Sequence, residues 1–338
     1  MREPAFWWQP GRGGLLSPLG GIYGAVAALR MRSKGRSVGV PVICIGNPTV
    51  GGAGKTPTAL AVGHILLAAH ERVFFLSRGY GGRLSGPVRV DAAVHSAAAV
   101  GDEPLMLARL APTIVAHDRV AGAETARRGG AGVIVMDDGF QNPALTKDLT
   151  ILVVDGRRGI GNGRTIPAGP LRAPLETQIS EADALIVVGR TDSLDAVIER
   201  ARRYNVAIFH GRLEPDKATV AALGGRGVLA FAGIGDPEKF FATLVEAGVT
   251  IGERASFADH HRYTAAEAQD LVARADAANL VLLTTEKDLA RLAGERRLAS
   301  LTAHANALPV RLAIDEAEKF RDLILKVLPQ REAKTPSR

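Results

Sequence analysis

The residues best placed to do chemistry lie in the stretch GNPTVGGAGKTPTAL, residues 46–60. Gly54, Lys55 and Thr56 match the end of the phosphate-binding pattern G-x-x-x-x-G-K-[ST], whose backbone N–H groups and lysine bind phosphates and whose hydroxyl binds Mg²⁺. The first glycine of that pattern is replaced by Thr49. A glycine-rich turn without a ligand is the alternative. We predict a nucleotide-phosphate site at Thr49, Val50, Gly51, Gly52, Ala53, Gly54, Lys55 and Thr56.

Acidic side chains farther along the chain could complete such a site. In VIVMDDG, Asp137 and Asp138 end an apolar run, where a carboxylate can bind Mg²⁺ directly or through water. An aspartate at a strand end is often only a helix cap. The predicted metal site therefore depends on the pairing of this segment with the phosphate loop.

Phosphoryl transfer to an alcohol also needs a group that orients or deprotonates the acceptor hydroxyl. An Asp–His pair can act as such a base, but sequence alone does not bring two residues together. The candidates are Asp102 and Glu103 in GDEP, and Asp259, His260 and His261 in FADHHRY. The segment TTEKDL, residues 284–289, does not fit the N/T-K-x-D pattern of guanine-specific loops, so ATP is the expected nucleotide.

The elements that must position these residues alternate between apolar strands and helices. The phosphate loop is expected to join a buried strand to a helix that begins near Lys55. The expected strands lie in VPVICIGN, RVFFLSRGYGG, TIVAHDR, AGVIVMDDGFQN, DLTILVVDG, ADALIVVG and VAIFHG. This alternation predicts an α/β fold, P-loop NTPase-like, with a mostly parallel, doubly wound sheet.

A second strand–helix alternation follows the connector GRLEPDKATVAALGGRG and predicts a second, smaller α/β domain. We place the boundary near residue 222. The expected organisation is an N-terminal helix region (1–36), a P-loop domain (37–222), a smaller C-terminal domain (223–328) and a disordered tail (329–338).

The net charge limits the expected binding partners, and the cysteine content limits the possible disulfides. The net charge of +7 favours phosphates, nucleic acid or an acidic membrane face. Nucleic acid is not expected, because no recognition helix, RNP motif or basic–aromatic patch is recognisable. The single cysteine, Cys44, excludes an internal disulfide and is expected in the core.

The N-terminal region predicts an amphipathic helix. Ser17 and Pro18 suit an N-cap and first turn, and the apolar residues after them recur on one helical face: Leu19, Ile22, Tyr23, Val26 and Leu29. The uncharged stretch is shorter than the roughly 20 residues needed to span a bilayer. With the basic cluster 30–36 and the adjacent Trp7 and Trp8, it predicts a helix lying on a membrane surface. A helix packed into the core is the competing interpretation.

The order of these motifs resembles that of tetraacyldisaccharide 4′-kinases, the lipid A 4′-kinases. The resemblance extends from the N-terminal helix to about residue 328. It rests on GNPTVGGAGKTP, SRGYGG, GDEP, MDDGFQN, PAGPLR, GDPEKFF, FADHH and LTTEKD. It implies transfer of the ATP γ-phosphate to the 4′-hydroxyl of tetraacyldisaccharide 1-phosphate, giving lipid IV-A. It also implies Mg²⁺, and peripheral or monotopic attachment to the cytoplasmic face of the inner membrane.

The resemblance assigns roles by position. Asp102 matches the family's catalytic aspartate and His260 its partner, so closure between the domains is expected to gate catalysis. Asp137 and Asp138 match the acids of the DDG motif. Gln141 matches the glutamine after that motif and is an expected substrate contact. Arg78, Arg119 and Arg172 lie in loops or at helix starts on the expected active-site edge, so we expect them to contact the lipid phosphate; simple solvation at the surface is the alternative.

One position departs from the family, because Ala173 stands where GPLRE would have glutamate. Glu176, one helical turn later, is the expected substitute. A membrane-recruited ATPase switch is the rival to a kinase. Its loop K-G-G-x-G-K-T would need lysine where this chain has Val50.

Overall fold

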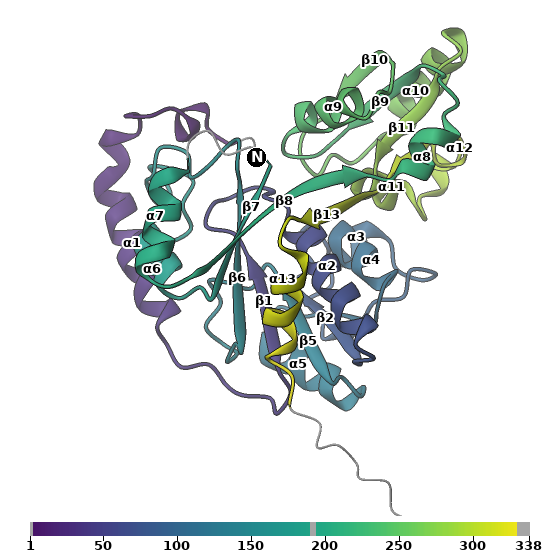
Figure 1. Ribbon diagram of the computed structural model, residues 1–338. Coiled ribbons are helices and arrows are strands. Elements are labelled where there is room, and N and C mark those ends of the chain that lie inside the picture. The colour runs from purple at the N-terminus through teal and green to yellow at the C-terminus, as the bar shows by residue number, and fades with distance from the viewer. Residues whose placement is uncertain (1–2, 190–193, 330–338) are drawn as a thin grey trace, which may run out of the picture.

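The computed structural model describes residues 3–189 and 194–329. Two sheets organise them (Figure 1). Within this part of the chain the larger sheet has nine strands, in the order β13-β8-β7-β6-β1-β5-β2-β4-β3. All neighbours pair in parallel except β13 with β8 and β3 with β4. The strands are β1 (Val42–Gly46), β2 (Val73–Ser77), β3 (Val88–Arg89), β4 (Thr113–Val115), β5 (Val133–Asp137), β6 (Leu149–Asp155), β7 (Ala184–Val188), β8 (Ala207–Pro215) and β13 (Val310–Ile314).

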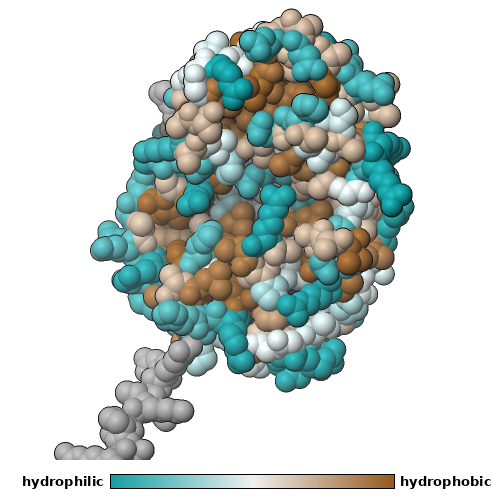
Figure 2. All heavy atoms as spheres, turned by 90° about the vertical axis from the view of Figure 1, so that its right-hand side faces the viewer, coloured by the Kyte–Doolittle hydropathy of each residue, from teal (hydrophilic) through white to brown (hydrophobic). Residues whose placement is uncertain are grey.

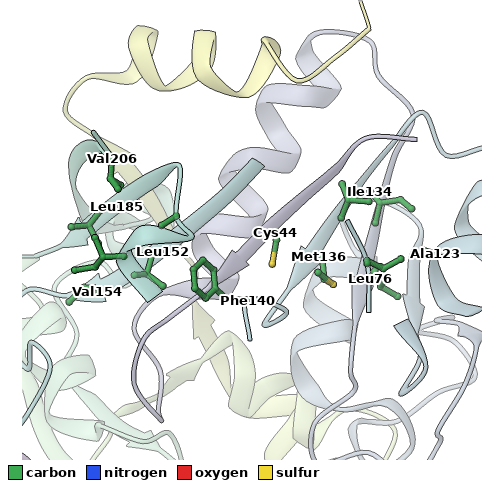
Figure 3. Packing of buried hydrophobic residues seen from close by; sticks show 14 of the residues in the cluster. Cys44, Leu76, Ala123, Ile134, Met136, Phe140, Leu152, Val154, Leu185 and Val206 are labelled. Carbon is green, nitrogen blue, oxygen red and sulfur yellow. The ribbon is translucent and has the colours of Figure 1, made fainter. Parts of the chain in front are cut away.

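Helices cover both faces of this sheet, so the predicted doubly wound α/β fold is confirmed. One face carries α5 (Arg119–Arg128), α6 (Leu175–Ser180) and α7 (Asp195–Arg203), and its core includes Cys44 and Phe140 (Figure 3). The other face carries α2 (Lys55–Ala68), α4 (Asp102–Ala108) and α13 (Ala317–Leu325); α3 (Ala97–Val100) precedes α4. Burial of apolar side chains on both faces explains why β1, β7 and, up to Met136, β5 are continuously apolar.

The smaller sheet is fully parallel within the described residues, in the order β10-β9-β11-β12. Its strands are β9 (Val228–Ala232), β10 (Ile251–Ser256), β11 (Val281–Thr285) and β12 (Asn306–Leu308). Its helical elements are α8 (Lys217–Ala222), α9 (Pro237–Glu246), α10 (Ala265–Ala277), α11 (Glu286–Leu292), η3 (Arg296–Leu298) and α12 (Ala299–His304). A separate core lies on each face of this sheet.

The C-terminal segment corrects the expected domain division. We expected residues 223–328 to form the smaller domain, but β13 pairs with β8 in the larger sheet, from Val310–Pro215 to Ile314–Gly211. Helix α13 places Phe320 and Ile324 in the core of the larger domain. The smaller domain is therefore inserted between β8 and β13, and β8 runs on into the expected connector (Figure 1). The tail expected at 329–338 lies outside the described residues except for Pro329.

Helix α1 (Ser17–Met31) lies against the larger domain through its glycines (Figure 1). Gly20 and Gly24 are buried, and a Cβ on Gly20 would lie 2.9 Å from the carbonyl oxygen of Thr165. Ser17 is the first helical residue rather than the N-cap, which is Leu16. The helix therefore contacts the protein mainly with small residues, and at its end with Met31, while its other large apolar side chains point outward.

The outward face of α1 is the predicted apolar face. Its exposed fractions are 56% for Leu19, 67% for Ile22, 41% for Tyr23, 54% for Val26 and 74% for Leu29. The core-packing interpretation of this face was therefore wrong. On the opposite side of the molecule, hydrophilic side chains interrupt the hydrophobic ones (Figure 2). Between residues 3 and 189, and between 194 and 329, no helix is both long and apolar enough to cross a bilayer.

The two tryptophans, which the sequence suggested as membrane anchors, are hydrogen-bonded within the protein. They form part of η1 (Ala5–Trp8) and precede η2 (Gly14–Leu16). Trp7 is buried, and its Nε1 donates to the carbonyl oxygen of Pro167 at 3.0 Å. Nε1 of Trp8 donates to Oε2 of Glu3 at 3.0 Å. Both indole N–H groups are therefore satisfied within the protein.

Candidate active site

The phosphate loop joins β1 to α2, and its lysine is folded back onto the loop. Nζ of Lys55 donates to Oδ1 of Asn47 at 3.0 Å and to the carbonyl oxygen of Gly51 at 3.2 Å. Burial lowers the pKa of Lys55, and the charge of Asp138, 3.8 Å away, opposes that shift. Gly51 and Gly54 have φ values of 96° and 94°, which glycine adopts without strain. The loop can wrap tightly even though Thr49 replaces the first glycine of the pattern.

Thr56 and Asp137 meet at the end of β5. Oγ1 of Thr56 donates to Oδ2 of Asp137 at 3.2 Å. Oδ1 of Asp137 is buried and has no hydrogen-bond partner among the described residues. Burial raises the pKa of Asp137 to about 7, and the charges of Glu103 and Asp138 add to this shift.

The donor set of Thr56 and Asp137 fits Mg²⁺. A hydroxyl and an unpartnered carboxylate oxygen are hard ligands, and Mg²⁺ commonly takes one or two such groups, with waters and substrate phosphates completing its shell. The described residues contain no group of three or more His, Cys, Asp or Glu side chains able to hold a metal ion. This protein surface therefore suits an ion that arrives with phosphate ligands.

Asp138 is bound to Arg172. Nη1 and Nη2 of Arg172 lie 2.9 and 3.4 Å from Oδ1 and Oδ2 of Asp138, and Nε donates to the carbonyl oxygen of Thr49 at 3.0 Å. Burial alone would raise the pKa of Asp138, but the charges of Lys55 and Arg172 bring it below its ordinary value. Arg172 thus ties the phosphate loop to an ionised carboxylate.

Asp102 and His260 come together from different domains. Asp102 is the first residue of α4, and His260 lies in the loop after β10. Nδ1 of His260 is 3.5 Å from Oδ2 of Asp102, and this interaction raises the pKa of His260. Burial alone would raise the pKa of Asp102, but His260, Lys287 and Arg291 hold it well below its usual range. The expected pair is therefore formed, with an ionised carboxylate.

Helix α11 holds this pair in place. This role of α11 was not predicted from the sequence. Nε of Arg291 donates to Oδ2 of Asp102 at 2.9 Å, and its Nη2 contacts the same oxygen. One turn earlier, Nζ of Lys287 donates to Oε1 of Glu103 at 2.7 Å. Glu103 in turn acts on the pKa values of Lys55 and Asp137, which relates α4 electrostatically to the phosphate loop. The i, i+4 spacing of two cations on a predicted helix was the available signal.

The other residues of the FADHHRY segment do different work. Nε2 of His261 lies 3.0 Å from Oε2 of Glu267, and its ring stacks on Phe257 with centroids 4.9 Å apart. Oδ2 of Asp259 is 3.9 Å from Nε2 of His260. His261 is therefore a packing residue, and His260 alone of the two histidines joins Asp102.

The residues expected to contact the lipid differ in exposure and in the hydrogen bonds they already make. Arg78 is exposed. Arg119 is 3% exposed; its Nη1 donates to the carbonyl oxygen of Ala116 at 2.5 Å, and its Nε has no partner among the described residues. Burial lowers the pKa of Arg119, and the nearby charge of Arg78 lowers it further. Nε2 of Gln141 donates to the carbonyl oxygen of Asn47 and to Oε1 of Gln178, both at 2.8 Å, so it supports the phosphate loop.

Comparison with known proteins then selects among the chemistries open to this site. Residues 13–329 match the family model described as tetraacyldisaccharide-1-P 4′-kinase. The chain belongs to this family.

Relatives and a solved structure agree with the assignment to the tetraacyldisaccharide-1-P 4′-kinase family. A tetraacyldisaccharide 4′-kinase from Rhodopseudomonas palustris (strain BisB18) is 54% identical over 98% of this chain and 97% of its own length. One from Bradyrhizobium sp. (strain BTAi1) is 51% identical over 99% and 98%. The crystal structure of an "apo" form of LpxK from Aquifex aeolicus in complex with ATP has a TM-score of 0.72 and 28% identity, covering 94% of this chain and 99% of that one. The predicted family and P-loop NTPase-like fold are confirmed.

The departure from the family pattern at Ala173 is not repaired by Glu176 in this structure. Ala173 is fully buried. The Glu176 side chain is 57% exposed; its Oε1 accepts from the hydroxyl of Tyr204 at 2.9 Å and its Oε2 lies 3.4 Å from Nε of Arg200. These partners lie on and just after α7, so the carboxylate of Glu176 is engaged away from the phosphate loop.

Proposed function

We propose that this protein is an ATP-dependent tetraacyldisaccharide 4′-kinase. It would transfer the γ-phosphate of ATP to the 4′-hydroxyl of tetraacyldisaccharide 1-phosphate in lipid A biosynthesis. The observation that carries the proposal is the Asp102–His260 pair, which joins the two domains in a chain of this family. The neighbouring Glu103 acts electrostatically on Lys55 of the phosphate loop. The loop accounts for the phosphate donor, and the pair accounts for the hydroxyl acceptor.

Lys55, Thr56 and the backbone of residues 49–56 would bind the phosphates of ATP. Lys55 now donates to Asn47 and Gly51, and these neutral partners can be exchanged for phosphate oxygens. Thr56 and Asp137 would hold Mg²⁺, with Asp138 nearby. When bound, the ion would neutralise charge on the phosphates. The chain itself orients the phosphates through the loop N–H groups and Lys55.

The acceptor hydroxyl would lose its proton to the Asp102–His260 pair. Its oxygen forms a bond to the γ-phosphorus while the bond from that phosphorus to the leaving ADP oxygen breaks. Asp102 is a weak base because Arg291 and His260 stabilise its charged form. We therefore assign the proton to His260, with Asp102 orienting the ring and stabilising its cation.

The exposed face of α1 would hold the enzyme at the membrane that carries its acylated substrate. Apolar side chains face outward, and Arg30, Arg32 and Lys34 at its end are exposed. We propose peripheral attachment to the cytoplasmic face of the inner membrane. Arg78, which is exposed, is the better candidate for the substrate's 1-phosphate, since Arg172 is engaged by Asp138 and Arg119 is buried. The proposal includes no nucleic acid partner.

A γ-phosphate transfer assay tests this proposal. Purified protein, Mg²⁺, detergent, labelled ATP and tetraacyldisaccharide 1-phosphate would be compared for the parent, Lys55→Ala and Asp102→Ala. We expect a labelled bisphosphorylated lipid that falls by at least about 100-fold in both variants. ATP hydrolysis without labelled lipid would instead support the ATPase-switch alternative.

A further inference from the structure

Arg158 lies at the phosphate loop but has no part in the site described so far. It follows β6, and its side chain is 26% exposed. Its guanidinium lies over the ring of Trp8, 4.3 Å from the centroid, and its Nη1 is 3.4 Å from Oε2 of Glu3. A guanidinium over an aromatic ring gains a cation–π contact, and its planar fork of N–H donors suits bidentate recognition of phosphate.

Glu3 covers the phosphate loop at Gly51. A Cβ added to Gly51 would lie 2.5 Å from Oε1 of Glu3 and 3.9 Å from Nη1 of Arg158. A carboxylate and a guanidinium therefore occupy the space directly above this glycine. Any side chain at position 51 would displace the carboxylate of Glu3.

Gly51 lies close to Lys55, the lysine of the phosphate loop. Lys55, whose role in such loops is to reach the β- and γ-phosphates, lies with Nζ 3.2 Å from the carbonyl oxygen of Gly51. A phosphate held by Lys55 would therefore lie close to Gly51, the residue over which Glu3 and Arg158 are placed. Phosphate and the Glu3 carboxylate are both anions, so they compete for Arg158.

The N-terminal segment that carries Glu3 is anchored to the larger domain. Besides the Trp7 contact to Pro167, the carbonyl oxygen of Trp7 accepts from the N–H of Asn162 at 2.7 Å. Nδ2 of Asn162 donates to the carbonyl oxygens of Arg12 and Ala168 at 3.2 and 2.9 Å. In Figure 1 the purple N-terminal segment leads from α1 across the top of the larger domain. These hydrogen bonds hold the segment in place and so position Glu3 over the phosphate loop.

We propose that Arg158 binds the terminal phosphate of ATP, and that Glu3 is the anion that holds Arg158 until the nucleotide arrives. The inference rests on the proposed function, because it takes ATP as the ligand. In the nucleotide-free protein Glu3 neutralises Arg158 and closes the space over Gly51. When ATP binds, its phosphate oxygens replace the carboxylate on Arg158, and Glu3 moves aside.

Charge favours this exchange. Burial raises the pKa of Glu3, Arg158 opposes that shift, and the charges of Asp259 and Asp236 in the smaller domain act in the same direction as burial. Once phosphate takes Arg158, the Glu3 carboxylate keeps the hydrogen bond from Nε1 of Trp8 but loses its counter-charge beside a polyphosphate. Arg158 then supplies a bidentate donor where negative charge develops during phosphoryl transfer.

Nucleotide binding tests the exchange directly. The chain has two tryptophans, Trp7 and Trp8, so intrinsic fluorescence reports on the ring under Arg158. We would titrate the full-length protein with a non-hydrolysable ATP analogue and with ADP, for the parent, Arg158→Ala, Arg158→Lys and Glu3→Gln. Arg127→Ala and Glu246→Gln, at exposed positions on α5 and α9, are the matched charge controls.

We expect Arg158→Ala to lower the affinity for the ATP analogue by at least about tenfold and the affinity for ADP by less. The same variant should lower kcat by at least about 100-fold. Arg158→Lys keeps the charge without the fork and should recover part of the loss. Glu3→Gln should tighten the analogue several-fold, with no effect when Arg158 is already alanine. The fluorescence change on binding should disappear in Trp8→Phe.

The outcomes separate this inference from the proposed function. Parent-like analogue binding and kcat in Arg158→Ala would overturn the role of Arg158 while leaving the kinase proposal intact. Should Arg158→Ala fail to fold, unchanged analogue affinity in Glu3→Gln would overturn the exchange by itself. A parent protein that binds no ATP would overturn both.

Discussion

Arg291 reaches across the two domains to Asp102, with its Nε 2.9 Å from Oδ2 of that carboxylate. The side chains of Arg291 and Asp102 are 9% and 2% exposed, so the pair is almost removed from water. His260 approaches the same oxygen from the same domain as Arg291. The charge state of Asp102, which orients the proposed base His260, therefore depends on the smaller domain being in place.

The pH dependence of the reaction should follow His260. A protonated imidazole cannot accept the hydroxyl proton, so kcat/KM should rise with pH through the pKa of His260. Asp102 raises that pKa. In Asp102→Asn the rate should fall by at least about 100-fold, and the acid limb should move to lower pH because the stabilising charge is gone.

The matched control for this profile is His261→Gln, since His261 pairs with Glu267 instead of Asp102. Its acid limb should stay in place. If the Asp102→Asn rate is too low to follow, the titration of His260 by NMR gives the same shift directly. An unshifted His260 pKa in Asp102→Asn would contradict the assigned interaction.

Asp137→Asn should stabilise the resting protein while abolishing transfer. Burial raises the pKa of Asp137 to about 7, so the ionised form is disfavoured in the fold and its folded-state cost appears as pH rises through that value. At pH 8 in EDTA the variant should unfold at a higher temperature than the parent. Its free energy of unfolding should be larger by up to a few kcal/mol. With Mg²⁺ and the ATP analogue the parent should gain more stability than the variant. A lower unfolding temperature in EDTA would show that Asp137 is not a destabilising charge.

The smaller domain should depend strongly on Asp288. Its carboxylate is fully buried and accepts hydrogen bonds from Tyr263, Thr285, Arg291 and the N–H of Gly233. Asp288→Ala would leave the buried hydroxyl of Tyr263 and the N–H of Gly233 unpaired and remove one carboxylate from Arg291, and we expect a loss of about 3–5 kcal/mol in thermal or urea unfolding.

Asp270→Ala is the comparison for Asp288→Ala. Asp270 also pairs with an arginine, Arg274, at 2.8 Å, but its side chain is 60% exposed. Removal of this surface pair should cost less than about 1 kcal/mol. Similar losses in the two variants would mean that burial is not what makes Asp288 important.

Membrane attachment should depend on the outward face of α1. Leu19→Ser, Ile22→Ser, Val26→Ser and Leu29→Ser combined should lower partition onto anionic lipid vesicles by at least about tenfold, since these side chains are exposed and contribute little to the core. Affinity for the ATP analogue should not change. Val94→Ser with Val245→Ser, two exposed apolar residues elsewhere, should leave partition unaltered.

Glu176→Gln should leave turnover within about twofold of the parent, as expected for an exposed surface group. The carboxylate contacts Tyr204 and Arg200 instead of the phosphate loop. The kcat and the KM for both substrates decide the matter. A large fall in kcat would restore Glu176 as the substitute for the glutamate missing at Ala173.

The larger sheet and the phosphate loop could be predicted because their signals are local. Three contiguous segments give the signal: an apolar strand, a glycine loop and a helix beginning at Lys55. Each can be recognised from its own residue pattern. The same reasoning placed Asp137 at a strand end. Asp102 and His260 were found as a pair only through the family resemblance, because 157 residues lie between them and no periodicity links them.

What could not be predicted depends on long-range pairing. The short strand β13 carries only five residues, and nothing in Val310–Ile314 indicates that it returns to β8 and not to the smaller sheet. The partners of Lys287 and Arg291 were missed for a similar reason, since a helix face shows its charges but not the surface it meets. Trp7 and Trp8 resembled membrane anchors because an indole, apolar with one N–H donor, suits both a membrane interface and a buried hydrogen bond within the protein.

The return of β13 to β8 has a consequence for biosynthesis. When the ribosome has made residues 1–215, the outer edge of β8 still lacks its neighbour, and the helix that brings Phe320 and Ile324 to the core does not yet exist. The whole inserted domain must emerge before that edge is covered. The first domain to be synthesised is therefore the last to be completed, and a chain stopped near residue 309 would display an open strand edge to other nascent chains.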